Sequence, residues 1–292
     1  MSAIEQEIAS QPELWRRAGA LAQTDRHDLP SAGSRLAVIG CGTSHHMAAA
    51  YAAARESAGT GETDAFAASE APTGRPYDEV LAISRSGTTS EVLDALRALP
   101  CSVHTSAVLG VAGTPVASTV KQAVVLDFAD EQSVVQTRFA TTALVYLLAG
   151  LGFDAEEAAA HAELALVAEL PVDPQSVHAF VFLGRGWTVG LAAEAALKLR
   201  EAALAWAEAY PALEYRHGPI ALAAPGTVVW PLGEVDRDLL DDIEATGASV
   251  VGGGLHPLAG LVLVQRTAVA LAKSRSLDPD RPRNLTRSVV LR

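Results

Sequence analysis

Short apolar runs alternate with longer segments of helical periodicity along most of the chain. Runs of four or five consecutive apolar residues predict buried strands, because a strand covered on both faces has no polar side. Segments with apolar positions three and four residues apart predict the helices between them. In the first half, the expected strands are 36–39, 80–83, 103–109 and 123–126, and the expected helices are 44–56, 89–99, 137–151 and 155–170.

The same pattern starts again near residue 179. The expected strands are 179–183, 228–232 and 250–251, and the expected helices are 188–210, 236–246 and 261–273. This alternation predicts an α/β fold with mostly parallel sheets flanked by helices. The restart predicts two units in tandem: an N-terminal domain over 1–160 with a leading helix, and a C-terminal domain over 161–292 with a C-terminal tail. Each unit contains a strand followed by Gly-x-Gly and a helix, which is consistent with an internal duplication.

The composition narrows the class of protein. Apolar residues make up 49% of the chain and charged residues 19%, which suffices for a buried core. The formal net charge of −12 argues against nucleic acid or an anionic membrane as partner. Two cysteines cannot form a disulfide framework. The start of the chain carries Glu5 and Glu7, unlike a signal peptide, and no apolar segment reaches 18 residues. We therefore expect a cytoplasmic enzyme or binding protein without a metal.

A glycine- and hydroxyl-rich loop, Gly-Cys-Gly-Thr-Ser, occupies residues 40–44 between a predicted strand and a predicted helix. The first N–H groups of a helix have no partner within the helix, so such a turn suits an anion. A tight turn in which Thr43 or Ser44 caps the helix would have the same pattern. This loop alone leaves both interpretations open.

A second loop, Ser-Arg-Ser-Gly-Thr-Thr at residues 84–89, is more specific. It offers four hydroxyl groups and the guanidinium of Arg85 within six residues, and phosphate oxygens need several donors at once. A capping box from Thr88 to Glu91 requires only one of these hydroxyls, so the pattern favours phosphate binding. A dinucleotide site at 184–190 is the weaker interpretation. Its acidic residue, expected about 20 positions later, would fall inside the predicted helix 188–210.

The predicted helix 188–210 is apolar on nearly every face, which indicates a buried helix. At about 100° per residue, Glu194, Lys198, Glu201 and Glu208 nevertheless all fall within an arc of roughly 80°. A solvated edge with a Glu194–Lys198 pair is one interpretation. The apolar surroundings favour the other, a polar cleft in which carboxylates perform acid–base chemistry. His217 follows in a loop bounded by Gly and Pro, and its role, structural or functional, stays open.

Five segments occur together in the order found in the sugar-isomerase (SIS) family. They are 40–44, 84–89, 196–201 with 207–210, 216–219 and 282–289. The chain resembles this family, and within it the isomerase half of glucosamine-6-phosphate synthases. The resemblance implies two SIS units, a homodimer, no cofactor, and a phosphorylated sugar or amino sugar as substrate.

The resemblance also implies roles for individual residues. The phosphate would be held by Thr43, Ser44, Ser84, Arg85, Ser86 and Thr89. Glu201 corresponds to the base that moves a proton between C1 and C2 of the open-chain sugar, with Lys198 as its neighbouring lysine. His217 corresponds to a histidine that assists ring opening and is contributed across the subunit interface. Glu208 corresponds to a further carboxylate of the site.

Two departures from the synthases shape the expected reaction. In the synthases a lysine near the C-terminus forms a Schiff base with the ketose, and Arg287 stands there in this chain. A guanidinium is a poor imine nucleophile, so Arg287 is expected to bind or polarise instead. No glutaminase half with its N-terminal cysteine is present, so glutamine is not expected to supply ammonia within this chain.

We therefore expect an enzyme that isomerises an amino-sugar 6-phosphate and releases ammonia. Plain isomerisation of a sugar phosphate and deglycation of a phosphorylated Amadori sugar are the alternatives among enzymes. A regulatory protein that only binds a sugar phosphate is a third possibility. The presence of both Glu201 and His217 argues against it, because binding alone needs neither.

Overall fold

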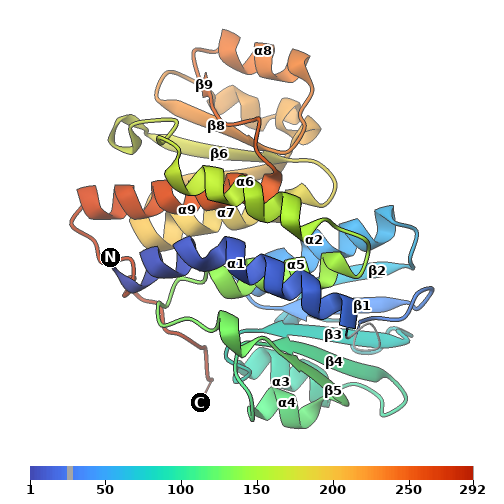
Figure 1. The fold of residues 1–292 in the computed structure, drawn as a ribbon. Helices are drawn as coiled ribbons and strands as arrows, with labels where there is room; N and C mark the ends of the chain where they lie inside the picture. Colours follow the sequence, from blue (N-terminus) through green and yellow to red (C-terminus); the bar gives the residue numbers. More distant parts are fainter. Residues whose placement is uncertain (25–28, 292) are drawn as a thin grey trace. The chain divides into compact units, whose positions relative to one another are not determined.

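The computed structural model describes residues 1–24 and 29–291 and divides the chain into two compact units. The β1–β5 unit comprises residues 13–132, 136–156 and 286–292. The β6–β9 unit comprises residues 1–12, 133–135 and 157–285. Two helices, α1 (Ala3–Thr24) and α6 (Ala155–Val167), each contribute residues to both units. Figure 1 shows the elements in sequence colours.

The β1–β5 unit is built on a sheet of five parallel strands in the order β2-β1-β3-β4-β5. Its strands are β1 (Leu36–Gly40), β2 (Thr63–Ala67), β3 (Glu79–Ser84), β4 (His104–Leu109) and β5 (Gln122–Val125). Its helices are α2 (Thr43–Ser57), α3 (Ser90–Arg97), α4 (Pro115–Thr119) and α5 (Arg138–Ala149), with short 3₁₀ helices η2 (Ala68–Glu70) and η3 (Asp127–Ala129).

The alternation of side chains along the strands explains the layers of this unit. Ala37 and Ile39 of β1 join a buried cluster with α3 and with Val116 of α4. Successive side chains of a strand point to opposite faces, so Leu36 and Val38 face the other layer, where α2 packs against α5. A strand buried on both faces needs the continuous apolar run that the sequence contains.

The β6–β9 unit repeats this plan with four parallel strands in the order β7-β6-β8-β9. Its strands are β6 (Ala179–Gly184), β7 (Ala207–Pro211), β8 (Thr227–Leu232) and β9 (Ser249–Val250). Its helices are α7 (Thr188–Ala203), α8 (Arg237–Ala245) and α9 (Pro257–Ser274), with 3₁₀ helices η4 (Pro174–Ser176), η5 (Leu213–His217) and η6 (Pro219–Leu222). The predicted α/β class with two parallel, helix-flanked sheets is confirmed.

In each unit, the strand that precedes the first crossover helix ends in a glycine, Gly40 in β1 and Gly184 in β6. A Cβ on Gly40 would come within 2.7 Å of the α2 backbone, and a Cβ on Gly184 within 2.4 Å of the α7 backbone. Real Cβ contacts do not reach such distances, so only glycine allows the tight turn from strand to helix. The equivalent positions, and the equivalent strand orders around β1 and β6, agree with a duplication.

The prediction of one helix over 188–210 is wrong. Helix α7 ends at Ala203, and Leu204 adopts the left-handed conformation (φ 52°) in which a chain leaves a helix. Its N–H and that of Ala205 donate to carbonyl oxygens of the last turn of α7. Strand β7 follows and carries Glu208, so Glu208 does not share a helix face with Lys198. Both missed strands, β2 and β7, lie at sheet edges, where polar residues interrupt the apolar run.

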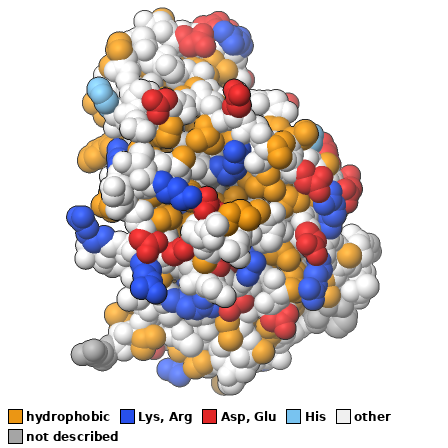
Figure 2. Space-filling view, turned by 60° about the vertical axis from the view of Figure 1, so that its left-hand side comes forward, with side chains coloured by type: hydrophobic (Ala, Val, Ile, Leu, Met, Phe, Trp, Pro, Cys, Tyr) orange, Lys and Arg blue, Asp and Glu red, His pale blue; other side chains and the backbone are white. Residues whose placement is uncertain are grey.

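The surface in Figure 2 carries acidic and basic side chains interspersed with apolar ones. No helix within the described ranges is long and apolar enough to cross a membrane.

Candidate active site

The hydroxyl-rich loops of the β1–β5 unit meet at the carboxyl ends of β1 and β3. These two strands are neighbours and parallel, so the loops that follow them lie side by side. A cavity of about 30 Å³ there is lined by Ser44, Ser84, Arg85, Ser86, Thr89 and Arg287, together with Cys41 and Gln136. Thr43 is buried in the first turn of α2 and does not line this cavity. The structure thus brings together five of the six residues that the resemblance assigns to phosphate binding.

None of the side-chain helix caps considered as alternatives for these two loops is present in the structure. Helix α3 begins at Ser90 with Thr89 as its N-cap, and no side chain caps it. The N-cap of α2 is Gly42, again without a side-chain cap, so neither Thr43 nor Ser44 has that role. The expected capping box from Thr88 is therefore wrong. Within the loop, Ser84 Oγ accepts a hydrogen bond from the N–H of Gly87, and Ser86 Oγ accepts one from the N–H of Thr88.

The C-terminal segment of the chain forms hydrogen bonds with two hydroxyl groups of the 84–89 loop. The Oγ of Ser288 lies 3.1 Å from Ser86 Oγ and 2.8 Å from Thr88 Oγ1. Two further hydrogen bonds join Ser90 to this segment, one to the carbonyl oxygen of Val289 and one from the N–H of Leu291. These hydrogen bonds hold the segment 288–291 against the loop 84–89 and the first residue of α3.

The guanidinium groups of Arg85 and Arg287 belong to one polar network in the same unit. Arg85 is buried and lies 3.4 Å from the carboxylate of Glu131, and it donates to the carbonyl oxygen of Arg287 at 2.9 Å. Burial lowers the pKa of Arg85, and Glu131 partly opposes that effect. Arg287 pairs with Asp130 and donates to the carbonyl oxygen of Glu131. The guanidinium of Arg287 is thereby held by one carboxylate and one carbonyl oxygen.

The β6–β9 unit contains the second group of candidate residues, on α7. The ammonium of Lys198 lies 3.2 Å from Glu194 and 2.6 Å from Glu201. Burial opposes the charge on Lys198, but the two carboxylates together raise its pKa above the ordinary value. Lys198 and Glu194 have 1% and 2% exposed side chains, whereas that of Glu201 is 19% exposed. Glu201 is thus the member of this triad that reaches a cavity.

That cavity has a volume of about 170 Å³ and is lined by Glu201, Leu204, Ser276, Asp278, Arg281 and Arg283, among others. Three non-glycine residues in the described ranges have positive φ: Leu204, Ser276 and Asn284. Two of them line this cavity, and Asn284 adjoins Arg283, which also lines it. Such backbone conformations cost about 1–3 kcal/mol each and concentrate at functional sites. The sequence did not indicate these positive-φ residues around the Glu201 cavity.

The other two candidates of this unit lie outside that cavity. Glu208 accepts a hydrogen bond of 2.9 Å from the hydroxyl of Tyr210, which lies two residues further along β7. His217 ends η5 and is exposed. Neither residue lines the Glu201 cavity.

Two residues of these sites escaped the sequence analysis. Glu131 is isolated in the sequence, yet it is fully buried against Arg85 and also accepts hydrogen bonds from Thr137 and Arg138. Ser288 lies within the family-like segment 282–289, but only its contacts with Ser86 and Thr88 indicate a role. No cluster of metal-ligating side chains occurs in the part of the chain that the structure describes.

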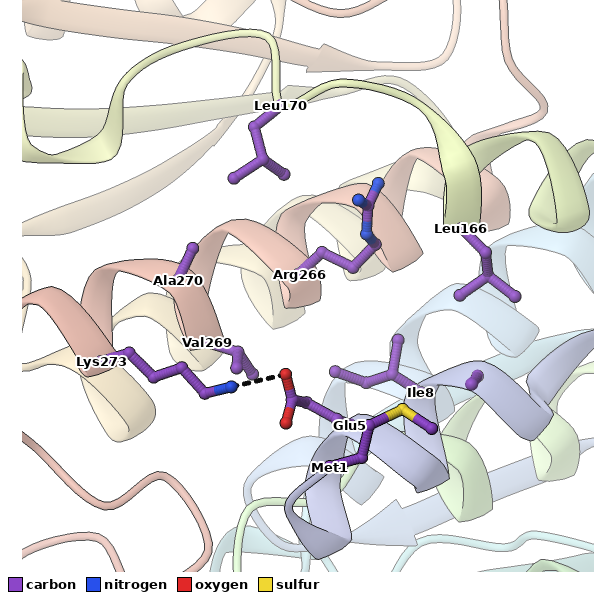
Figure 3. Close-up of a pocket in the computed structure, with 10 residues that line it drawn as sticks. Met1, Glu5, Ile8, Leu166, Leu170, Arg266, Val269, Ala270 and Lys273 are labelled. Atoms are coloured by element: carbon purple, nitrogen blue, oxygen red, sulfur yellow. Dashed lines mark hydrogen bonds and ion pairs between the residues drawn. The ribbon is translucent and has the colours of Figure 1, made fainter.

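A different cavity, of about 400 Å³, lies among α1, α6 and α9 in the β6–β9 unit (Figure 3). Its walls are mainly apolar, and its ion pair, Glu5–Lys273 at 2.6 Å, is internally neutral. Arg266 donates to the carbonyl oxygens of Ala165 and Ala168 near the end of α6. These charged side chains therefore form contacts between helices. The cavity also lacks the hydroxyl groups of a sugar-phosphate site.

Comparisons with known proteins agree with this architecture. No family model matches the chain. A glutamine–fructose-6-phosphate aminotransferase of Methanothermobacter thermautotrophicus is 30% identical over 88% of this chain and 52% of its own length. One from Chlamydia muridarum is 28% identical over 98% of this chain and 58% of its own. The chain spans about half the length of the curated relatives it matches.

Solved structures cover the chain more completely. Glucosamine-6-phosphate deaminase of Thermotoga maritima superposes with a TM-score of 0.87 and 26% identity, covering 99% of this chain and all of that one. The C-terminal domain of glucosamine-fructose-6-phosphate aminotransferase from Francisella tularensis gives a TM-score of 0.79 at 21% identity, covering 95% and 97% of the two chains. At 21% identity, the similarity to the Francisella tularensis domain is a similarity of fold.

Two parallel sheets of the same plan, with hydroxyl-rich loops at the strand ends of one unit and a carboxylate–lysine triad in the other, make up the architecture of this chain. In fold and in sequence the chain is similar to sugar-isomerase (SIS) proteins. This similarity extends over nearly all its length both to the aminotransferases and to a glucosamine-6-phosphate deaminase.

Proposed function

We propose that this protein isomerises an amino-sugar 6-phosphate between aldose and ketose and releases ammonia in the same reaction. The observation that carries the proposal is the Lys198–Glu201 pair, in which a buried ammonium holds a carboxylate at the wall of a cavity. A carboxylate placed at a cavity is able to take a proton from one carbon and return it to the next. Lys198, whose pKa is raised, stays protonated and holds the carboxylate of Glu201 in position.

The proposed steps balance as follows. Glu201 takes the proton from C2 of the open-chain aldose. The electron pair forms the C1–C2 double bond, the C1=O π pair moves onto O1, and O1 takes up a proton, which gives an enolamine. A proton returned from the Glu201 carboxyl, which exchanges with solvent, adds to C1, and loss of one N–H proton, equal to the one that O1 took, leaves an imine at C2. One water then adds to C2 and ammonia leaves, so the product is the ketose phosphate. No step needs a Schiff base with the protein, which agrees with Arg287 replacing the lysine of the synthases.

The phosphate is proposed to bind at the loops after β1 and β3. The supporting observation is the convergence of Ser44, Ser84, Ser86 and Thr89 on one cavity. The cavity is small, and Ser288 is hydrogen-bonded to Ser86, one of its lining residues. A bound phosphate is expected to displace Ser288 or to accept a hydrogen bond from it. Ser86→Ala combined with Thr89→Ala should raise KM with little effect on kcat.

The similarity to a deaminase favours ammonia release over plain isomerisation, since the superposition covers nearly all of this chain and all of the deaminase. We also propose that the protein acts as a homodimer in which His217 serves the partner's site. Two facts support this: His217 is exposed, and it does not line the cavity of its own Glu201.

The decisive experiment is a panel of amino-sugar 6-phosphates assayed for ammonia and for exchange of the C2 hydrogen with solvent deuterium. Glu201→Gln keeps the shape of the side chain and removes its basicity. It should lower kcat by about 10²–10⁴-fold with little change in KM and abolish the exchange. Glu214→Gln, a change at an exposed carboxylate of the same unit, is the matched control and should retain both. Exchange without ammonia would indicate a plain isomerase, and wild-type exchange in Glu201→Gln would refute the assignment of the base.

A further inference from the structure

A cavity of about 380 Å³ lies at the carboxyl ends of β8 and β9 in the β6–β9 unit. It shares no lining residue with the Glu201 cavity. In parallel α/β sheets, ligands bind outside the carboxyl ends of the strands, and small-molecule sites have volumes of about 300–1,000 Å³. The position and size of this cavity therefore match those of a binding site, and the proposed reaction does not use it.

The inner wall of the cavity contains an indole N–H group that has no acceptor in the described part of the chain. Trp230 lines the cavity with only 1% of its surface exposed, and no acceptor for its indole N–H is found within the described ranges. Gly252 lies against this edge of the ring, since a Cβ there would be 2.4 Å from the indole nitrogen. The chain thus keeps this side of the indole open to the cavity.

The loop after β9 adds further donors. Gly252, Gly253 and Gly254 all have positive φ and are exposed. Their N–H groups, and that of Leu255, have no hydrogen-bond acceptor in the described part of the chain. The helix that follows is already capped: the N–H of Leu258 donates to His256 Nδ1, and the N–H of His256 donates to His161 Nδ1. The donors come from the loop and the indole rather than from the end of α9.

The charges around the cavity restrict the ligand class. Glu157 and Glu234 line it and are exposed, and no lysine or arginine lines it. His256 is uncharged at neutral pH, because burial, with a smaller effect of His161, lowers its pKa to about 4. The carboxylates disfavour an anion, and the N–H donors of the loop and the indole disfavour a cation. Hydroxyl groups, which both accept and donate, satisfy both parts of the wall.

We propose that this cavity is a second small-molecule site, which binds a neutral polyhydroxylated ligand of about monosaccharide size. Ligand oxygens accept hydrogen bonds from the Trp230 indole and the glycine N–H groups, and ligand hydroxyls donate to Glu234. This proposal is independent of the reaction at Glu201.

The test uses the full chain, labelled with ¹⁵N, and follows the indole and glycine N–H signals by NMR. Methyl α-D-glucopyranoside is the probe, and inorganic phosphate is the charged comparison. We expect a saturable shift of the Trp230 and Gly252–Gly254 signals with the glucoside. The indole of Trp206, which is 69% exposed in the same unit, should not move. Glu234→Gln should weaken binding by roughly three- to tenfold, the loss typical of one hydrogen bond.

Trp230→Phe should abolish the saturable shift at Gly253, whereas Trp206→Phe should retain it. If Trp230→Phe does not fold, the Glu234→Gln titration decides by itself. The proposal is overturned if the glucoside leaves the Trp230 and glycine signals unmoved at millimolar concentrations. It is equally overturned if inorganic phosphate moves them in a saturable way and the glucoside does not.

Discussion

Replacing Lys198 by Met tests whether the triad on α7 is a buried ionic network. The methionine fills a similar volume but leaves the carboxylate of Glu194, which is 2% exposed, without its ammonium. Removing one partner of a buried pair costs about 3–5 kcal/mol, because the other charge remains desolvated. With a urea m-value of about 2 kcal/mol/M, the unfolding midpoint of the β6–β9 unit should fall by roughly 1.5–2.5 M.

Tryptophan fluorescence suits this measurement, since Trp187, Trp206 and Trp230 lie in the β6–β9 unit. Lys273→Met is the matched control: the same substitution in the same unit removes the Glu5–Lys273 ion pair, also at 2.6 Å. The Lys273 side chain is 52% exposed, so the loss should be only roughly 0–1 kcal/mol. Equal midpoints for the two variants would refute the argument that burial makes the α7 triad different.

The difference in unfolding midpoint between wild type and Lys198→Met should depend on pH in one direction only. The pKa of Lys198 is raised in the folded protein, so its stabilising effect is complete below the unfolded value of about 10.4. It is lost only as the pH rises through the higher folded value. The difference in midpoint between wild type and Lys198→Met should therefore be constant across neutral pH and shrink only in strong alkali. A difference that disappears near neutral pH would contradict the raised pKa.

Three further predictions concern the β1–β5 unit and the assembly. Gly87→Ala should destabilise the protein by about 1–3 kcal/mol more than Gly113→Ala in urea unfolding; both glycines have positive φ, but only at Gly87 would a Cβ meet Thr114, at 2.1 Å. Borohydride reduction with a ketose phosphate should leave the mass of the wild-type protein unchanged, because Arg287 forms no imine, and a trapped adduct in the wild type would exclude the proposed steps. Sedimentation should show a dimer at micromolar concentration, and a fully active monomer would refute the shared role of His217.

The sequence was most informative where burial leaves no ambiguity. The central strands β1, β3, β6 and β8 are covered on both faces, so their apolar runs were visible without any tertiary information. The two glycine turns were equally visible, since a helix starting directly after a strand leaves no room for a Cβ. These local constraints were enough for the α/β class, the repeat and the position of the hydroxyl-rich loops.

The sequence misplaced elements where a local pattern permits two structures. Residues 204–210 have the composition of a helix, yet Leu204 reverses the chain and β7 pairs with β6. Strand pairing is a contact with distant residues, and no helical periodicity within 188–210 reports it. Glu208 was therefore placed on the wrong element, whereas Lys198 and Glu201, three residues apart on α7, were placed on the correct helix face.

Only the tertiary structure decided which polar residues meet. Arg85 and Glu131 are 46 positions apart and Ser86 and Ser288 are 202 apart, so no spacing rule connects them. The structure also assigned residues 286–292 to the β1–β5 unit and residues 1–12 to the β6–β9 unit, each far from its neighbours in sequence. The physical reason is that the sequence fixes local backbone preferences and burial. The pairing of distant charges and hydroxyls depends instead on how the strands are ordered in each sheet.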